Sequence, residues 1–308
     1  MPFKNVSSVR KVASVEGAVT GGAFNRALSA VAISSNNPVQ IALLPLNGVN
    51  PKVQNVQLDD VSDIALLNRA MAVVKAGDST WALLDIEHKP KVEELHRDTK
   101  AICAKASGGL ALGLKWDGSG VEYAPGKNDV AMRDFTLRGD TRCADVGETE
   151  TYAVVDGGDG EFRIHPGSTP EPGSATKIAL PPGAKNLDRI RGGKFTSAIY
   201  KRGNPNVCLI RRAGNRLDAK MLTLAWPPTD VAVVETTMLV TTADGRIVLF
   251  DAESLDKATT SLIEARFEAH LGCRGEPRVM VVAGQTLFVG TSTGEILQGA
   301  IVRKQATA

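Results

Sequence analysis

The chain has 308 residues, a formal net charge of +2 and 43% apolar residues. A charge so close to zero excludes any argument from bulk electrostatics for a nucleic-acid or membrane partner. The sequence contains neither an apolar leader nor an apolar run of about 18 residues, so we expect a soluble intracellular protein. The 30 Gly and 15 Pro favour many short strands joined by turns.

One strand–turn–strand pattern recurs along the chain, and it is clearest between Thr236 and Leu255. There the apolar residues Met238–Thr242 predict a buried strand, Asp244 and Gly245 predict a tight turn, and Arg246–Phe250 predict the returning strand. Seven copies can be aligned on one apolar residue, and these anchors are Leu28, Met71, Leu110, Tyr152, Phe195, Met238 and Leu287. The anchors lie 39 to 49 residues apart, which is typical of β-propeller blades.

Each blade needs four strands, so the segments around each hairpin should supply two more. Short apolar segments precede the hairpins, at 15–19, 64–67, 101–106, 142–146, 189–191, 231–234 and 278–282. Others follow the first six hairpins, at 53–58, 92–96, 131–137, 176–180, 219–224 and 262–267. The seventh hairpin lacks a follower, and we predict that Phe3–Val9 completes its blade and closes the ring. Burial of Phe3, Val6 and Val9 would offset a loop-closure cost of roughly 5 kcal/mol.

The whole chain resembles the seven-bladed β-propellers of the WD-repeat-like superfamily. Phe250-Asp251 and Leu84-Asp85 stand where the signature Trp-Asp pair is found in that superfamily. No copy has Trp-Asp at that place, and no regular Gly-His pair precedes the inner strands, so the resemblance is one of architecture. It implies a single all-β domain over residues 1–308, built as seven four-stranded antiparallel blades.

Motifs for enzymatic chemistry are missing from the sequence, which contains no phosphate-binding loop, metalloprotease motif or hydrolase elbow. Cys103, Cys143, Cys208 and Cys273 have no metal or redox spacing, and we expect buried free thiols and no cofactor. Some propellers hold a catalytic metal in the central channel through carboxylates. The inner-strand acids that could do so here are Glu16, Asp63, Asp145 and Glu148.

The fifth repeat is strongly basic, because nine cations and two acids lie between Asp188 and Lys220. From this segment we select seven candidate partner-binding residues: Arg189, Arg191, Lys201, Arg202, Arg211, Arg212 and Arg216. Their side chains either face solvent for solubility alone or form a docking surface for an acidic protein segment or RNA. Aromatic residues are sparse around them, which favours protein over RNA.

Trp226 precedes two prolines in the connection between the fifth and sixth repeats. It is either an exposed anchor for a bound peptide or a side chain packed between blades. We therefore predict a non-catalytic scaffold that binds other proteins within an intracellular complex. The alternatives are an RNA or ribonucleoprotein-binding module that uses residues 188–220, and a channel-centred metal-dependent enzyme.

Overall fold

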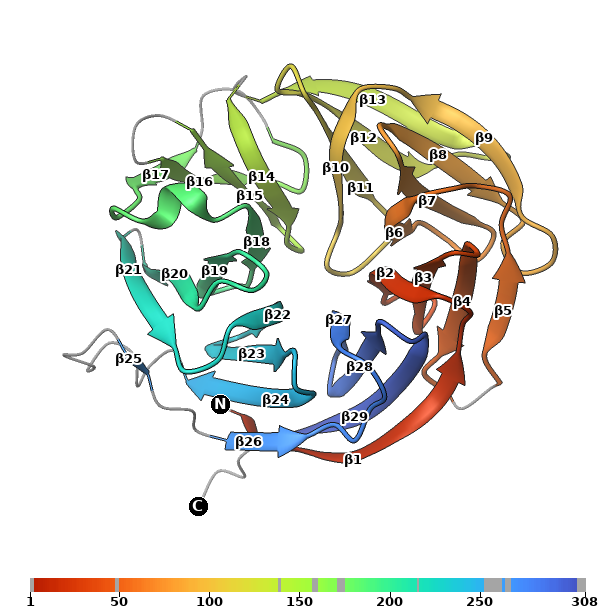
Figure 1. Ribbon diagram of the computed structural model, residues 1–308. Helices are drawn as coiled ribbons and strands as arrows, with labels where there is room; N and C mark the ends of the chain where they lie inside the picture. Colours follow the sequence, from red (N-terminus) through yellow and green to blue (C-terminus); the bar gives the residue numbers. More distant parts are fainter. Residues whose placement is uncertain are drawn as a thin grey trace.

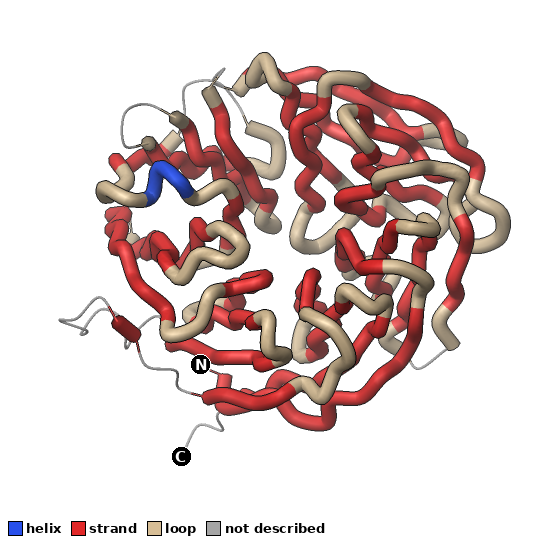
Figure 2. The backbone as a smooth tube through the Cα atoms, viewed as in Figure 1, coloured by secondary structure: helices blue, strands red, loops and turns tan. Residues whose placement is uncertain are grey.

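Seven antiparallel sheets are arranged radially around a central channel, which confirms the predicted seven-bladed propeller (Figure 1). The computed structural model describes residues 3–47, 50–137, 140–156, 160–170, 175–214, 216–251, 262–263 and 267–303. Within these ranges the one helix is a short 3-10 turn, Ala184–Asn186. None of the described segments is a helix long and apolar enough to cross a membrane. Strands and the turns between them make up the rest of the described ring (Figure 2).

The first four blades each use four consecutive strands, in the order inner to outer. Blade 1 contains β2 (Ala18–Asn25), β3 (Ala30–Asn36), β4 (Gln40–Pro45) and β5 (Lys52–Asn55). Blade 2 contains β6 (Val61–Leu66), β7 (Met71–Ala76), β8 (Ser79–Leu84) and β9 (Lys91–His96). Blade 3 contains β10 (Thr99–Ala104), β11 (Ala111–Lys115), β12 (Ser119–Pro125) and β13 (Val130–Thr136). Blade 4 contains β14 (Thr141–Val146), β15 (Glu150–Val155), β16 (Glu161–Pro166) and β17 (Thr176–Ala179).

The last three blades depart from this simple order. Blade 5 contains β18 (Arg189–Gly192), β19 (Thr196–Tyr200), β20 (Asn206–Ala213) and β21 (Arg216–Leu224), and β25 (Leu262–Ile263) is added to its outer edge. Blade 6 contains β22 (Pro228–Val234), β23 (Thr237–Thr242), β24 (Arg246–Asp251) and β26 (Phe267–His270). Blade 7 contains β27 (Pro277–Ala283), β28 (Thr286–Thr291), β29 (Glu295–Arg303) and the N-terminal strand β1 (Phe3–Ser14).

The N-terminal strand closes the ring, as the sequence predicts. β1 pairs antiparallel with β29, and Val6 lies opposite Ile301 in this pairing. Val6 is buried with Leu297 and Ile301, and Val9 packs against the same cluster. The strand continues to Ser14, beyond the predicted end at Val9, so closure uses a longer ladder than expected.

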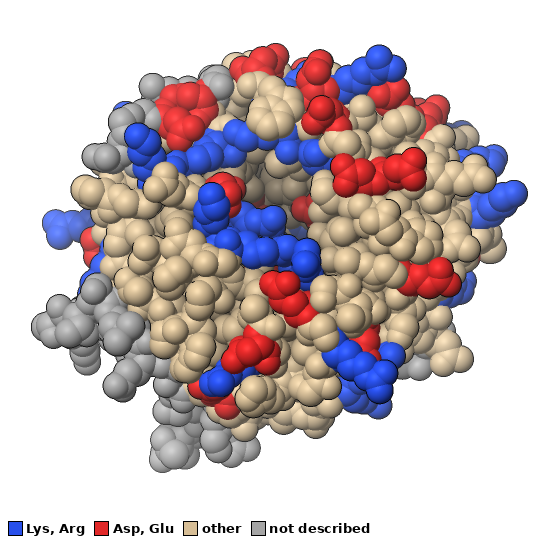
Figure 3. Space-filling model, in the orientation of Figure 1, with Lys and Arg blue, Asp and Glu red and all other residues tan. Residues whose placement is uncertain are grey.

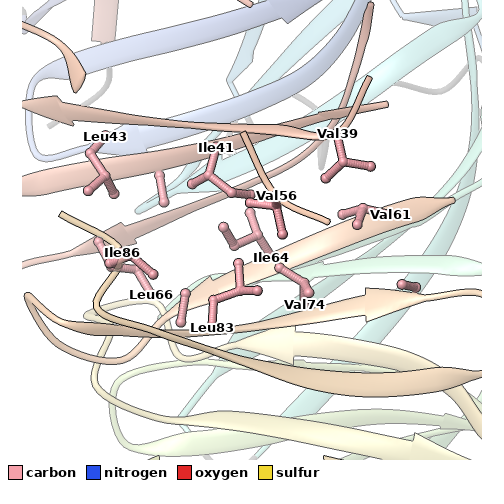
Figure 4. Close-up of a cluster of buried hydrophobic side chains, with 13 residues drawn as sticks. Val39, Ile41, Leu43, Val56, Val61, Ile64, Leu66, Val74, Leu83 and Ile86 are labelled. Carbon is pink, nitrogen blue, oxygen red and sulfur yellow. The ribbon is translucent and has the colours of Figure 1, made fainter. Parts of the chain in front are cut away.

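Apolar side chains are buried mainly between adjacent blades. The cluster in Figure 4 brings Ile41 and Leu43 of blade 1 together with Ile64, Val74 and Leu83 of blade 2. Each strand alternates its side chains between the two faces of its sheet, so every blade can contribute to two such interfaces. The packing therefore joins consecutive blades into one ring rather than into separate lobes.

The inner strands contact one another around the ring, from β2 through β6, β10, β14, β18, β22 and β27 back to β2. The beginnings of β6, β10, β14 and β18 all line one cavity, so these strands run in the same direction. We call the end of the ring at which inner strands begin the upper face; Figures 1 and 3 show this face. Because blades are antiparallel, the turns between second and third strands also lie there.

Two predicted elements and one thiol are placed differently. The inner strand of blade 1 is Ala18–Asn25 rather than 15–19, because Val15 and the turn at Gly17 precede it. The prediction that residues 262–267 form the outer strand of blade 6 was wrong, because that strand is Phe267–His270. Residues 264–266 lie outside the described part of the chain. Leu262–Ile263 instead pairs in parallel with β21 of blade 5. Cys103, Cys143 and Cys208 are buried, whereas Cys273 is partly exposed.

Candidate functional site

The central channel is hollowed into two connected parts. The upper cavity has a volume of about 430 Å³ and opens onto the upper face, where Lys and Arg gather round the opening (Figure 3). A lower cavity of about 160 Å³ is lined mainly by the middle and later residues of the inner strands. Asp63 and Arg191 line both cavities, so the two parts meet at these side chains.

Four neighbouring blades contribute cations to the upper cavity. We call the following set the basic mouth: Lys75, Lys100, Arg142, Arg189 and Arg191. The acids that line the same cavity are Asp63 and Asp188. Positive charge therefore exceeds negative charge within one concave volume, which raises the local concentration of anions.

Two of these cations are placed by β-bulges at the beginnings of inner strands. Register shifts occur between Thr99 and Ala101 in β10 and between Thr141 and Cys143 in β14. Lys100 and Arg142 are the extra residues at these bulges. A bulge twists the strand locally and redirects a side chain. The fold therefore presents these cations from the ring itself rather than from long loops.

Arg191 lies deeper in the channel and is surrounded by aspartates. Its Nη2 atom is 3.9 Å from Oδ1 of Asp230, and it also interacts electrostatically with Asp145 and Asp63. The Arg191 side chain is still 37% exposed, because it faces the solvent of the channel. One guanidinium thus balances negative charge from three blades.

The channel aspartates are also bound to the backbone. Asp145 accepts hydrogen bonds from the amides of Val146 (3.0 Å) and Gly192 (2.7 Å), and the latter lies in the next blade. Asp63 accepts one from the amide of Ile64 at 2.8 Å. Burial in the ring raises the pKa of Asp63 to about 6, although Arg191 opposes this shift. Burial raises the pKa of Asp145 as well.

The acids considered for a channel metal do not converge on one point. Asp63 and Asp145 accept hydrogen bonds from backbone amides, while Glu148 forms an ion pair with Arg26. Across the described ranges, no group of three or more His, Cys, Asp or Glu side chains could hold a metal ion. Among these acids, Asp145 joins blades 4 and 5 through the amide of Gly192, and Glu148 joins blades 4 and 1 through Arg26.

The predicted basic surface of blade 5 is divided between the two ends of the ring. Arg189 and Arg191 line the upper cavity. Lys201 and Arg202 follow β19, also at the upper face, where Lys201 lies 3.9 Å from Asp188. Arg202 donates hydrogen bonds to the carbonyls of Thr229 (2.9 Å) and Arg278 (2.5 Å), so it ties blade 5 to blades 6 and 7.

The other three arginines lie at the opposite end. Arg211 and Arg212 are near the end of β20, and Arg216 begins β21, so all three belong to the lower face. Arg212 forms an ion pair with Glu150 of blade 4. A single ligand in the channel mouth therefore cannot contact all seven predicted residues.

The structure also places two tryptophans at the upper face. Trp226 is partly buried, packs against the core between blades 5 and 6, and has the Arg246 guanidinium 5.5 Å from its ring centroid. This contact supports the interpretation of Trp226 as a packed side chain. Trp116 is 62% exposed, lines the upper cavity, and lies 5.6 Å from Nζ of Lys100.

Sequence reasoning missed Lys75, Lys100, Arg142 and Trp116 as site residues. Lys100 of β10 and Trp116, directly after β11, both come from blade 3, and the ring brings them together with Lys75 of blade 2 and Arg142 of blade 4. A local signal existed for Trp116, because a large aromatic side chain directly before a predicted turn is exposed at the end of its hairpin. Lys100 and Arg142 occupy equivalent positions at the start of the inner strand in successive repeats. Alignment of the repeats at these positions would have indicated that the two cations lie at the same end of the channel.

Comparison with known proteins supports the fold alone. Neither a known protein family nor a curated protein matches the sequence. The fold is similar to that in the solved structure of U3-55K, with a TM-score of 0.66 and 10% sequence identity over 98% of this chain and 100% of that chain. In all, 1446 solved chains match, so the likeness to any one of them does not select an activity. The chain is a seven-bladed β-propeller with a basic mouth at one end of its channel.

Proposed function

We propose that this protein is a non-catalytic scaffold that binds another protein through its upper face, as a subunit of an intracellular complex. The observation that carries this proposal is the basic mouth, in which four blades direct cations into one cavity. Cations held close together repel one another and do not stabilise the fold. Their arrangement therefore favours the binding of an anionic ligand. The blade-to-blade contacts of Arg202, Asp145 and Asp230 keep the surface rigid before a partner arrives.

RNA binding is the second candidate function. It is favoured by Trp116, whose exposed ring next to Lys100 offers one surface for a base to stack on. RNA would also lose affinity steeply with salt, because binding releases counterions from the phosphates.

Affinity capture from the native source tests the scaffold role directly. The full chain is tagged, captured with and without ribonuclease treatment, and crosslinked through its lysines before mass spectrometry. We expect a stoichiometric protein partner that resists ribonuclease and crosslinks to Lys75, Lys100 or Lys201 of the upper face. Recovery that depends on RNA would favour the second candidate instead. A partner crosslinked solely to the lower face or the outer edges would disprove the assignment of the surface.

A further inference from the structure

We propose that the basic mouth binds a short acidic segment of the partner protein, with two or three adjacent Asp or Glu side chains inside the upper cavity. The inference rests on the proposed scaffold function and specifies the chemistry of its ligand. It depends on three features of the described residues: cations without an ion pair, exposed aspartates outside the mouth, and one exposed aromatic side chain.

Three cations of the basic mouth form no ion pair among the described residues, although the charge of Arg189 opposes the rise in the pKa of Asp63. Within the described part of the chain, Lys75, Lys100 and Arg189 have no carboxylate at ion-pair distance. The ammonium groups of Lys75 and Lys100 donate to the carbonyls of Gly77 and Thr141 instead. Three donors are left with spare hydrogen-bonding capacity around one cavity, which suits a ligand with several acceptor oxygens.

Arginines elsewhere on the ring contrast with this arrangement. Arg133 is paired with Glu122 at 3.2 Å, Arg97 with Glu94 at 3.0 Å, and Arg163 with Glu161 at 2.6 Å. The cations of the mouth come from four blades, and two of them have carboxylate partners: Arg142 pairs with Asp156 at 3.2 Å, and Arg191 faces Asp63 and Asp230. Asp188 faces Lys201. Lys75, Lys100 and Arg189 are therefore three cations that share one cavity and have no ion pair within the described ranges.

Acidic residues stand outside the mouth on the same face. Asp78 and Asp117 occupy turns between second and third strands, Asp98 directly precedes β10, and all three side chains are exposed. In Figure 3 acidic groups lie both beside the central cations and farther from the channel, where Lys and Arg side chains are also present. The excess of cations inside the cavity attracts a compact anionic group, whereas the exposed Asp78, Asp98 and Asp117 repel a long polyanion that passes over them. This pattern favours a short acidic peptide segment over a polynucleotide strand.

Trp116 gives the segment an apolar contact beside the charges. Its ring is the most exposed large hydrophobic side chain in the described chain and borders the same cavity as Lys75, Lys100 and Arg189. Tryptophan is enriched among residues that dominate binding. We therefore expect an aliphatic or aromatic residue next to the acidic group of the partner, packed on the free part of the Trp116 ring.

Binding of defined probes to the purified full chain tests the proposal. The probe is a fluorescein-labelled eight-residue peptide that contains Glu-Glu-Glu-Leu between Gly and Ser. A matched peptide with Gln in place of each Glu and a six-nucleotide oligouridylate serve as comparisons. We expect measurable affinity for the Glu peptide alone, weakened as salt rises because the contacts are charged.

Variants of the mouth identify the residues responsible. The double variant Lys100→Glu/Arg189→Glu should weaken binding of the Glu peptide by at least about tenfold. Trp116→Ala should weaken it by a smaller factor. Arg216→Glu, on the lower face, is the matched control and should leave the affinity within about twofold. Arg189→Gln replaces one exposed side chain without reversing its charge, and provides a second test should the double variant unfold.

The outcomes separate this proposal from the scaffold function. Absence of Glu-peptide binding, equal binding of the Gln peptide, or an affinity unaffected by the mouth variants would overturn the acidic-segment proposal. Tighter binding of the oligouridylate through the same residues would overturn it in favour of RNA. A captured partner that crosslinks to the upper face would still support the scaffold in any of these cases.

Discussion

The hydroxyl of Tyr200 donates a hydrogen bond to Oδ1 of Asp230 across the boundary between blades 5 and 6. Oδ2 of the same aspartate accepts from the amide of Met280 at 2.7 Å, which extends the contact to blade 7. Asp230 is 2% exposed, so its loss would leave these donors without a partner away from bulk water. One carboxylate thus joins three blades at the beginning of an inner strand.

Asp230→Ala should lower the free energy of unfolding by roughly 3 kcal/mol, because several buried donors lose their acceptor. Tyr200→Phe removes one bond and should cost about 1 kcal/mol. The double variant should be less destabilised than the sum of the two, because both substitutions remove the same bond. Urea unfolding followed by tryptophan fluorescence measures these values, with Asp78→Ala at an exposed turn as the control. Additive effects would show that the Tyr200–Asp230 bond contributes nothing.

Ring closure depends on the N-terminal strand, and Val6 tests it. Val6 is 6% exposed and lies opposite Ile301, so Val6→Asp places an unpaired charge in the pairing that closes the ring. We expect strong destabilisation and aggregation, because β29 would expose an unpaired edge. Lys11→Ala, on the same strand but exposed, should lower the free energy of unfolding by no more than about 1 kcal/mol. Equal melting temperatures for wild type and Val6→Asp would contradict closure by β1.

The architecture was predictable because each blade repeats a local pattern. Strand, turn and strand at Met238–Phe250 are specified by neighbouring residues, and the same holds for the other six hairpins. The strand at Leu262–Phe267 could not be placed correctly, because an apolar segment near a blade edge can pair with either of two sheets. Only the tertiary arrangement shows that Leu262–Ile263 pairs with β21.

The site was harder to predict than the fold. A count of charges along the chain assigns Arg189, Arg211 and Arg216 to one basic segment. The antiparallel strands of blade 5 nevertheless place Arg189 at the upper face and the other two at the lower face. The count also misses Lys75, Lys100 and Arg142, which are far apart in sequence but share one cavity. Cations from successive blades meet at the channel although they are separated along the chain. They therefore form no cluster of charge in the sequence.

Thiol accessibility distinguishes Cys273 from the other cysteines. Cys103, Cys143 and Cys208 are no more than 7% exposed, and burial raises the pKa of each thiol. Cys273 is partly exposed, with a pKa also raised by burial. The native protein should therefore react slowly with one equivalent of a thiol reagent, and with four after unfolding. The variant Cys273→Ser should remove the native reaction; a second reactive thiol in that variant would contradict the burial of the others.

The raised pKa of Asp63 predicts how stability depends on pH. Its pKa is about 6 in the folded ring against 3.8 ordinarily, so between these values the folded protein binds more protons than the unfolded chain. Stability from this group is therefore present below about pH 4 and is lost as the pH rises through 6. Asp63→Asn cannot lose a proton, and its amide oxygen can still accept from Ile64.

The difference in unfolding free energy, Asp63→Asn minus wild type, should consequently increase between pH 4 and pH 7, by about 3 kcal/mol at most. Urea unfolding at several pH values measures it, and contributions from Asp145 cancel because both proteins contain it. Asp117 provides a control of opposite sign, because hydrogen bonds from Ser119 lower its pKa. Asp117→Asn should lose stability relative to wild type as the pH rises, with the change confined to values below about 4. A flat or falling difference for Asp63→Asn across the window would show that the charges of Arg191 and Arg189 compensate fully for the burial of the carboxylate.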